Sequence, residues 1–137
     1  MAAIEKQLSV FMENKPGRLS KICNILADAK INVYAMSVHD TVDHAIIRLI
    51  VDNPTKALIL LEEEGLYIVT QDVVVVEIDN KPGIISSIAA KLYRADINIE
   101  YAYCTATRNQ DVGALVIKTQ DAEQAQEILQ EADFDFH

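Results

Sequence analysis

The chain has 137 residues, of which half are apolar, 6% are aromatic and none is tryptophan, and its formal net charge at pH 7 is −9. This length suits one ordinary domain or two small ones, with a core built mainly from aliphatic side chains. The acidic balance argues against nucleic-acid binding, because phosphates are bound by clustered Lys and Arg.

The first half of the chain predicts an alternation of strands and helices. Apolar or β-branched runs indicate strands, and apolar residues three or four positions apart indicate helices. Asn53 is the expected cap of the second helix, and Pro54 fits its first turn. The expected order is a strand at 7–12, a turn at 14–17, a helix ending near Ala29, strands at 31–38 and 45–51 around a polar turn at 40–43, a helix ending at Gly65 and a strand at 66–69.

The second half predicts the same order. Its elements are a strand at 73–78, a turn at 80–83, a helix ending near Ala95, strands at 97–105 and 114–118 around a polar turn at 107–111, a helix from Asp121 to about Ala132 and a candidate last strand in the C-terminal "FDFH".

The two halves are a sequence repeat. With an offset of 66 residues, Asn-Lys-Pro-Gly at 14–17 matches the same four residues at 80–83, and "AKINV" at 29–33 matches "ADINI" at 95–99. The apolar helix positions between these segments also stay in phase. A repeat of this length indicates a duplicated unit, and we expect two domains, 1–70 and 71–137.

Each half has the order β-α-β-β-α-β, which predicts an α+β, ferredoxin-like fold. In such a fold, helices cover one face of a four-stranded antiparallel sheet. Strands such as 73–76 are apolar on both sides, so the helix-free face also needs a cover. We expect the other half or another copy of the chain to cover it, and therefore a homodimer or a larger homo-oligomer.

The Asn-Lys-Pro-Gly segments join a strand to a helix in both halves, and we call them the NKPG loops. Gly17 and Gly83 permit backbone angles that other residues avoid and let a ligand approach the main chain. The amides that follow have no intrahelical acceptor and lie at the positive end of the helix dipole, which suits a small carboxylate. Asn14 and Asn80 either cap the helix or bind a polar group of a ligand. A well-made turn without a ligand is the alternative for a single copy, and the repetition favours a function.

These features resemble the ACT-domain family of small-molecule, chiefly amino-acid, sensing modules. The resemblance rests on N-x-P-G-x-[LI] at 14–19 and 80–85, each followed by Asn between aliphatic residues at 31–33 and 97–99, and it covers about 7–70 and 73–137. In that family two domains lie side by side in an eight-stranded sheet, and an amino acid binds between the loop of one domain and the second strand of its neighbour. The resemblance implies two sites, one formed by Asn14, Gly17 and Leu19 with Asn98, and one formed by Asn80, Gly83 and Ile85 with Asn32.

The two loops differ in the residue after glycine. Arg18 follows in the first and Ile84 in the second, and both are ligand-binding candidates. Arg18 is a possible partner for a ligand carboxylate, while a solvated surface arginine is the favoured alternative. Some amino-acid-binding members carry a polar side chain two positions before the loop asparagine, where this chain has Met12 and Ile78. This difference argues against recognition of a polar ligand side chain there.

No residue pattern indicates catalysis, a metal or a cofactor. His39 and His44 flank a turn without further ligands at zinc-like spacing, and Cys23 and Cys104 have no CxxC spacing and no neighbouring histidine. Glycine-rich nucleotide-binding motifs are missing. The N-terminus lacks the pattern of a signal peptide, and no apolar run reaches the length of a membrane span. We expect a cytoplasmic protein with reduced thiols, no catalytic residue, no metal and no cofactor.

The sequence therefore predicts a non-catalytic, allosteric regulatory module that binds a free amino acid or a similar small carboxylate, without nucleic-acid or membrane partners. Ligand binding would stabilise one arrangement of domains or subunits by no more than its differential affinity. A biosynthetic enzyme is a candidate partner. The alternative is an obligate regulatory small subunit of an amino-acid biosynthetic enzyme, and the least favoured hypothesis is a small enzyme on a ferredoxin-like fold.

Overall fold

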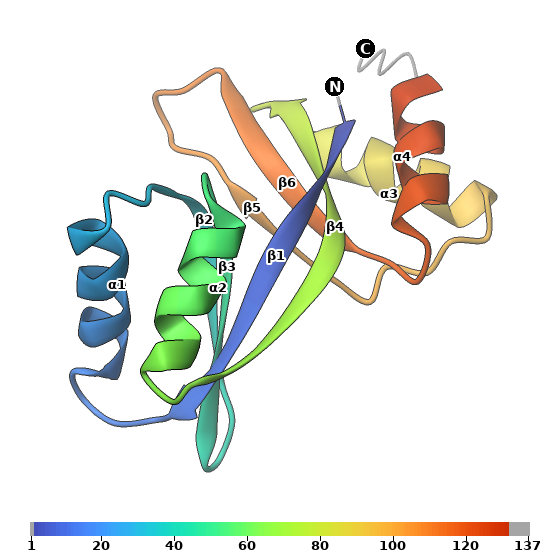
Figure 1. Ribbon diagram of the computed structural model, residues 1–137. Coiled ribbons are helices and arrows are strands. Elements are labelled where there is room, and N and C mark those ends of the chain that lie inside the picture. The colour runs from blue at the N-terminus through green and yellow to red at the C-terminus, as the bar shows by residue number, and fades with distance from the viewer. Residues whose placement is uncertain (1, 132–137) are drawn as a thin grey trace. The chain divides into compact units, whose positions relative to one another are not determined.

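The computed structural model describes residues 2–131, which contain the expected alternation of strands and helices (Figure 1). The elements are β1 (Ala2–Glu13), α1 (Arg18–Asp28), β2 (Val33–Asp40), β3 (His44–Val51), α2 (Pro54–Glu63), β4 (Tyr67–Asp79), α3 (Ile84–Arg94), β5 (Tyr101–Thr105), β6 (Val112–Lys118) and α4 (Ala122–Glu131). The predicted ferredoxin-like fold class is confirmed. The candidate strand "FDFH" lies outside the described residues. No helix in the described part is long and apolar enough to cross a membrane.

The described residues form two compact units. The first unit consists of residues 6–71, and the second unit consists of residues 2–5 together with residues 72–131. The long strands β1 and β4 each pass from one unit into the other. The assignment of 1–70 and 71–137 to two family domains stays a prediction.

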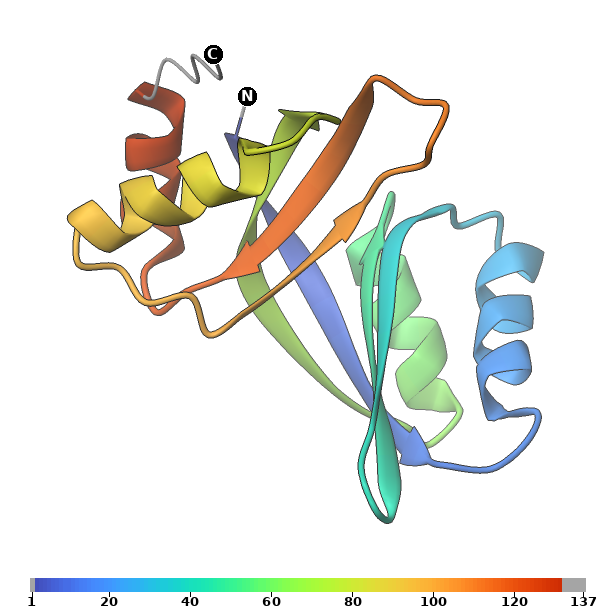
Figure 2. The same cartoon turned by 180° about the vertical axis from the view of Figure 1, so that it is seen from behind.

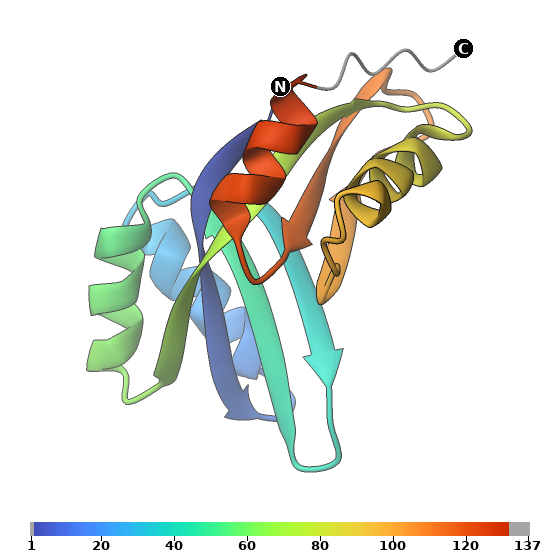
Figure 3. The ribbon, with the colours of Figure 1, turned by 90° about the vertical axis from the view of Figure 1, so that its right-hand side faces the viewer.

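The first unit has the strand order β2-β3-β1-β4, and α1 and α2 contact each other on one face of these strands (Figures 1 and 3). Alternate residues of a strand share a face, and helix residues four apart share a stripe. This periodicity brings together the core residues of β1, α1 and α2, which are Leu8, Val10, Met12, Ile22, Leu26, Ala57 and Leu61. The antiparallel register between β1 and β3, with Leu8 opposite Leu49, completes that core.

The second unit repeats this arrangement with β1-β4-β6-β5 and the contacting helices α3 and α4 (Figure 2). Its core includes Val74, Val76, Ile78, Ile88, Leu92, Leu115, Ile117, Ala125 and Leu129. The position that β4 fills in the first unit is filled here by residues 2–5 of β1. Ala2 is 2% exposed, and its carbonyl accepts hydrogen bonds from Gln126 Nε2 at 3.2 Å and Gln130 Nε2 at 2.9 Å.

The predicted start of α2 is confirmed. Asn53 accepts a hydrogen bond from the Lys56 amide at 3.2 Å, and Pro54 is the first helical residue. Three strands differ from expectation. β1 begins at Ala2 rather than at residue 7. The runs 66–69 and 73–78 form the single strand β4, because no Gly or Pro separates them. β5 begins at Tyr101 rather than at residue 97, because its ladder with β6 starts with Tyr101 opposite Lys118, and Ile97 and Ile99 pack against the core of the second unit ahead of the strand.

We predict that Ala2→Asp destabilises the second unit. A carboxylate at this buried position loses its hydration inside an apolar core, so the free energy of unfolding in urea should fall by at least about 2 kcal/mol. Ala3→Asp is the matched control because Ala3 is exposed on the same strand, and it should change stability by less than about 0.5 kcal/mol. Equal effects of the two variants would contradict the placement of residues 2–5 in this core.

Candidate functional site

Each NKPG loop ends in a glycine with left-handed backbone angles, and the helix begins at the next residue. Gly17 has φ 87° and ψ −11°, and Gly83 has φ 90° and ψ −10°. A Cβ atom at either glycine would meet no atom within 4 Å. The backbone conformation, rather than lack of space, therefore selects glycine at both positions.

Two amides at the start of each helix precede the first helical hydrogen bond. In α1 the ladder begins with Lys21 N–H donating to the Gly17 carbonyl at 3.0 Å, and in α3 with Ser87 donating to Gly83 at 3.0 Å. The amides of Leu19 and Ser20, and of Ile85 and Ser86, lie before these bonds and have no acceptor within their helices. Such amides, at the positive end of the helix dipole, can donate to an anion.

The loop asparagines fasten the loops to the neighbouring hairpins. Asn14 Nδ2 donates to Asp40 Oδ1 at 2.5 Å, and Asn80 Nδ2 donates to the carbonyls of Thr107 at 2.8 Å and Gln110 at 2.9 Å. The alternative that they cap the helices is wrong, and the alternative that they bind a polar group of a ligand stays a prediction. The N-cap positions belong to the glycines, and neither helix has a side-chain cap.

The remaining predicted site residues fall into different environments. Leu19 is half-buried, whereas Ile85 is 46% exposed. The Ile84 side chain is buried in the core of the second unit, so this residue presents only its main chain to the loop. Asn32 and Asn98 are exposed. Their predicted pairing with the opposite loops stays a prediction.

The asparagines that precede β2 and β5 have separate surroundings. The Asn32 amide donates to Asp52 Oδ1 at 3.1 Å, and its carbonyl accepts from the Asp52 amide at 3.1 Å. Asn98 lies in a hollow of about 270 Å³ in the second unit. The rest of that hollow is lined by Asp96, Ile97, Glu100, Gln120, Asp121 and Gln124.

The first loop carries more charge than the second. Glu13 Oε2 lies 2.8 Å from Lys15 Nζ and 3.7 Å from an Arg18 guanidinium nitrogen. The hydrogen bond and the charge of Lys15, followed by the charge of Arg18, lower the pKa of the Glu13 carboxyl. In the second loop Asp79 and Lys81 are 4.0 Å apart, and Ile84 replaces the arginine. Arg18 therefore forms an ion pair with Glu13 beside the first loop.

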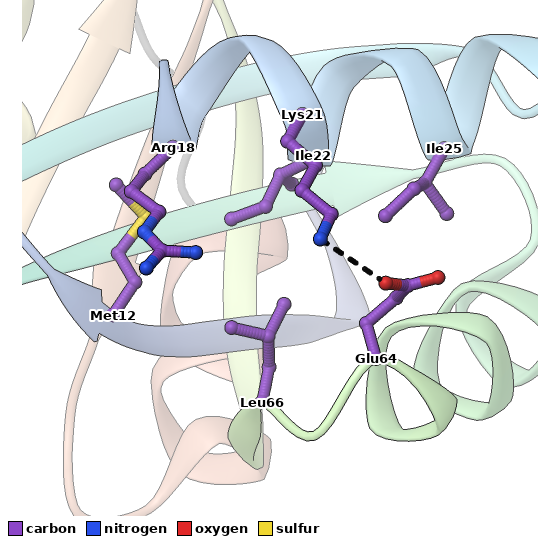
Figure 4. A pocket seen from close by; sticks show the side chains of 7 residues that line it. All are labelled: Met12, Arg18, Lys21, Ile22, Ile25, Glu64 and Leu66. Atoms are coloured by element: carbon purple, nitrogen blue, oxygen red, sulfur yellow. Dashed lines mark ion pairs between the residues drawn. The ribbon is translucent and has the colours of Figure 1, made fainter. Parts of the chain in front are cut away.

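A cleft of about 30 Å³ lies beside the first loop, between α1 and the residues that follow α2. Its lining consists of Met12, Arg18, Lys21, Ile22, Ile25, Glu64 and Leu66 (Figure 4). Sequence reasoning found only Arg18 as a functional candidate in this set. The one available signal was that Lys21 and Ile25 differ from their repeat partners, Ser87 and Lys91.

No three His, Cys, Asp or Glu side chains between residues 2 and 131 are grouped so that they could hold a metal ion. The thiols of Cys23 and Cys104 are free, the first half-buried and the second exposed.

We predict that Glu13→Gln lowers stability at neutral pH and that the difference disappears in acid. The pKa of the Glu13 carboxyl is lower in the folded state than its ordinary value of 4.5. The carboxylate therefore stabilises the fold at pH values above 4.5, and this stabilisation is lost as the pH falls through the folded-state pKa. Urea denaturation of both proteins over this pH range measures the difference. Asp79→Asn is the control in the second loop, where no arginine follows. A difference that persists unchanged in strong acid would contradict the ion-pair explanation.

Comparison with known proteins places these features in a family. The ACT domain pair family matches residues 3–137. A crystal structure of a protein from Bacteroides thetaiotaomicron is 34% identical, with a TM-score of 0.87 and coverage of 95% of this chain and 89% of that chain. No curated protein matches the chain.

Two regulatory subunits share the fold at lower identity. The regulatory subunit of aspartate kinase from Thermus thermophilus, in its ligand-free form, is 20% identical, with a TM-score of 0.71 and coverage of 96% of each chain. The corresponding subunit from Thermus flavus is 21% identical, with a TM-score of 0.64 and coverage of 95% of each chain. With its duplicated fold and a family match that runs from residue 3 to residue 137, this chain belongs to the family of ACT domain pairs.

Proposed function

We propose that the protein is a non-catalytic regulatory module that senses a free amino acid or a similar small carboxylate. The observation that carries this proposal is the pair of open amides behind a left-handed glycine, formed in the same way in both units. A carboxylate has two oxygens that can accept from adjacent N–H groups, and the helix dipole favours its charge.

The loop asparagines act as positioning residues in this proposal. Their amide groups hold the loop against a hairpin, so the open amides keep one orientation before the ligand arrives. Preorganised donors cost less entropy on binding than donors on a mobile loop. As part of the proposal, Asn98 and Asn32, which precede the second strands of neighbouring ACT domains, bind the polar end of the ligand.

The second candidate function is an obligate regulatory subunit of an amino-acid biosynthetic enzyme. It is supported by the two regulatory subunits of aspartate kinase, which match this chain over 96% and 95% of their own lengths. Sensing and a subunit role are compatible, since a chain that binds a ligand needs a partner or a self-assembly to report the binding. A homodimer, allosteric coupling and a cytoplasmic setting belong to this proposal.

We predict that one or two of the twenty common amino acids, at millimolar concentration, raise the melting temperature in differential scanning calorimetry. A ligand that binds only the folded state stabilises it by mass action, so the shift should grow with ligand concentration. If no amino acid moves the transition of the folded chain, the sensor proposal fails. Co-purification with a large enzyme would then favour the obligate subunit.

The active amino acid is then tested with Gly17→Ala and Gly83→Ala. Both variants strain the same left-handed turn, at φ 87° and φ 90°, so each is the control for the other. The variant at the occupied loop should lose most of the ligand-induced shift, while the other variant should keep it. Equal retention in both variants would contradict binding at the loop amides.

A further inference from the structure

We propose that the cleft beside α1 in the first unit is a separate binding site for an amino acid with a short aliphatic side chain. This cleft does not include the open amides of the NKPG loops, and its lining residues all belong to the first unit. The proposal therefore stands on its own geometry, and Arg18 is the one lining residue that is also a ligand-binding candidate of the first loop.

The floor of the cleft is apolar. Ile22 and Ile25 point into it from α1, and Leu66 points toward them from the opposite side (Figure 4). Met12 on β1 closes one end. The cleft is open on one side, and its volume of about 30 Å³ holds one methyl branch of a short aliphatic side chain and excludes an aromatic ring.

The rim of the cleft carries both signs of charge. Lys21 Nζ lies 3.4 Å from Glu64 Oε2 across the opening (Figure 4), and Arg18 stands on the same side as Lys21. The side chains of Lys21 and Glu64 are 58% and 41% exposed, and exposed ion pairs contribute little to stability. A zwitterion can therefore place its carboxylate at Lys21 and Arg18 and its ammonium group at Glu64, in exchange for two exposed ion pairs, Lys21 with Glu64 and Arg18 with Glu13.

A wider hollow continues from the cleft and provides room for the charged end of the ligand. It measures about 410 Å³ and shares Met12, Arg18, Glu64 and Leu66 with the cleft. Small-molecule sites combine such an apolar floor with a few polar groups at the mouth. The balance of cationic and carboxylate groups around the opening favours a zwitterion over a ligand with a net charge.

The second unit does not repeat this lining. The repeat partners of Arg18, Lys21 and Ile25 are Ile84, Ser87 and Lys91, so both rim cations and one floor residue are replaced. The proposal therefore assigns one such site to each chain, whereas the NKPG loops occur twice. This difference separates the two kinds of site experimentally.

We predict that L-valine, used as the probe, shifts the methyl NMR signals of Ile25 and Leu66 in a saturable manner at millimolar concentration. Isobutyrate and isobutylamine, which each lack one of the two charges, should not saturate the site. Lys21→Met and Glu64→Gln should each weaken L-valine binding about threefold to tenfold. Lys56→Met is the control, because Lys56 is exposed in the first unit and does not line the cleft.

The open amides of both loops, those of Leu19 and Ser20 and of Ile85 and Ser86, separate this site from the loops. Methyl shifts at Ile25 and Leu66 without shifts of these amides support the cleft whatever happens to the loop proposal. Unmoved methyl signals, with or without shifts of these amides, overturn the cleft proposal. The same L-valine affinity in Lys21→Met, Glu64→Gln and Lys56→Met would also overturn it.

Discussion

The left-handed turn at Gly17 and Gly83 is the constraint on which the candidate sites depend. It lets α1 and α3 start directly after the loop, with glycine rather than a capping side chain at the N-cap position. A capping residue would have satisfied one of the first amides, and glycine leaves them open. Because the asparagines do not cap the helices, their side chains are available to hydrogen-bond the hairpins and hold the loops to them. Loop, helix start and hairpin thus form one small assembly in each unit, with donors fixed in place for a carboxylate.

A second constraint is the sharing of β1 between the two units. Its first residues contribute Ala2 to the core of the second unit, while Leu8, Val10 and Met12 contribute to the core of the first. Gln126 and Gln130 on α4 hold the Ala2 carbonyl, so the strand is fixed at its start as well as by the ladder with β3. One strand therefore supports both cores, and the stability of the second unit depends on residues that lie far apart in the chain.

The repeat made the fold and the two loops predictable, because apolar periodicity and the Asn-Lys-Pro-Gly segments are local signals. The role of residues 2–5 was not predictable, since "AAIE" is short and its pairing is set by tertiary structure. The roles of Asn14 and Asn80 were also missed in part, because an asparagine at this position can either cap the helix or anchor a hairpin, and the sequence does not distinguish the two roles. The cleft at Lys21 and Glu64 depends on packing between α1 and the end of α2, which no spacing encodes.

The most direct test of the account is an amide NMR titration of the labelled chain with the active amino acid and with its carboxamide derivative, which lacks the carboxylate. The account predicts that the free amino acid shifts the amide signals of Leu19 and Ser20, of Ile85 and Ser86, or of both pairs, and that the carboxamide leaves them nearly unchanged. Equal shifts with both compounds, or shifts confined to residues away from the helix starts, would contradict carboxylate binding by the open amides.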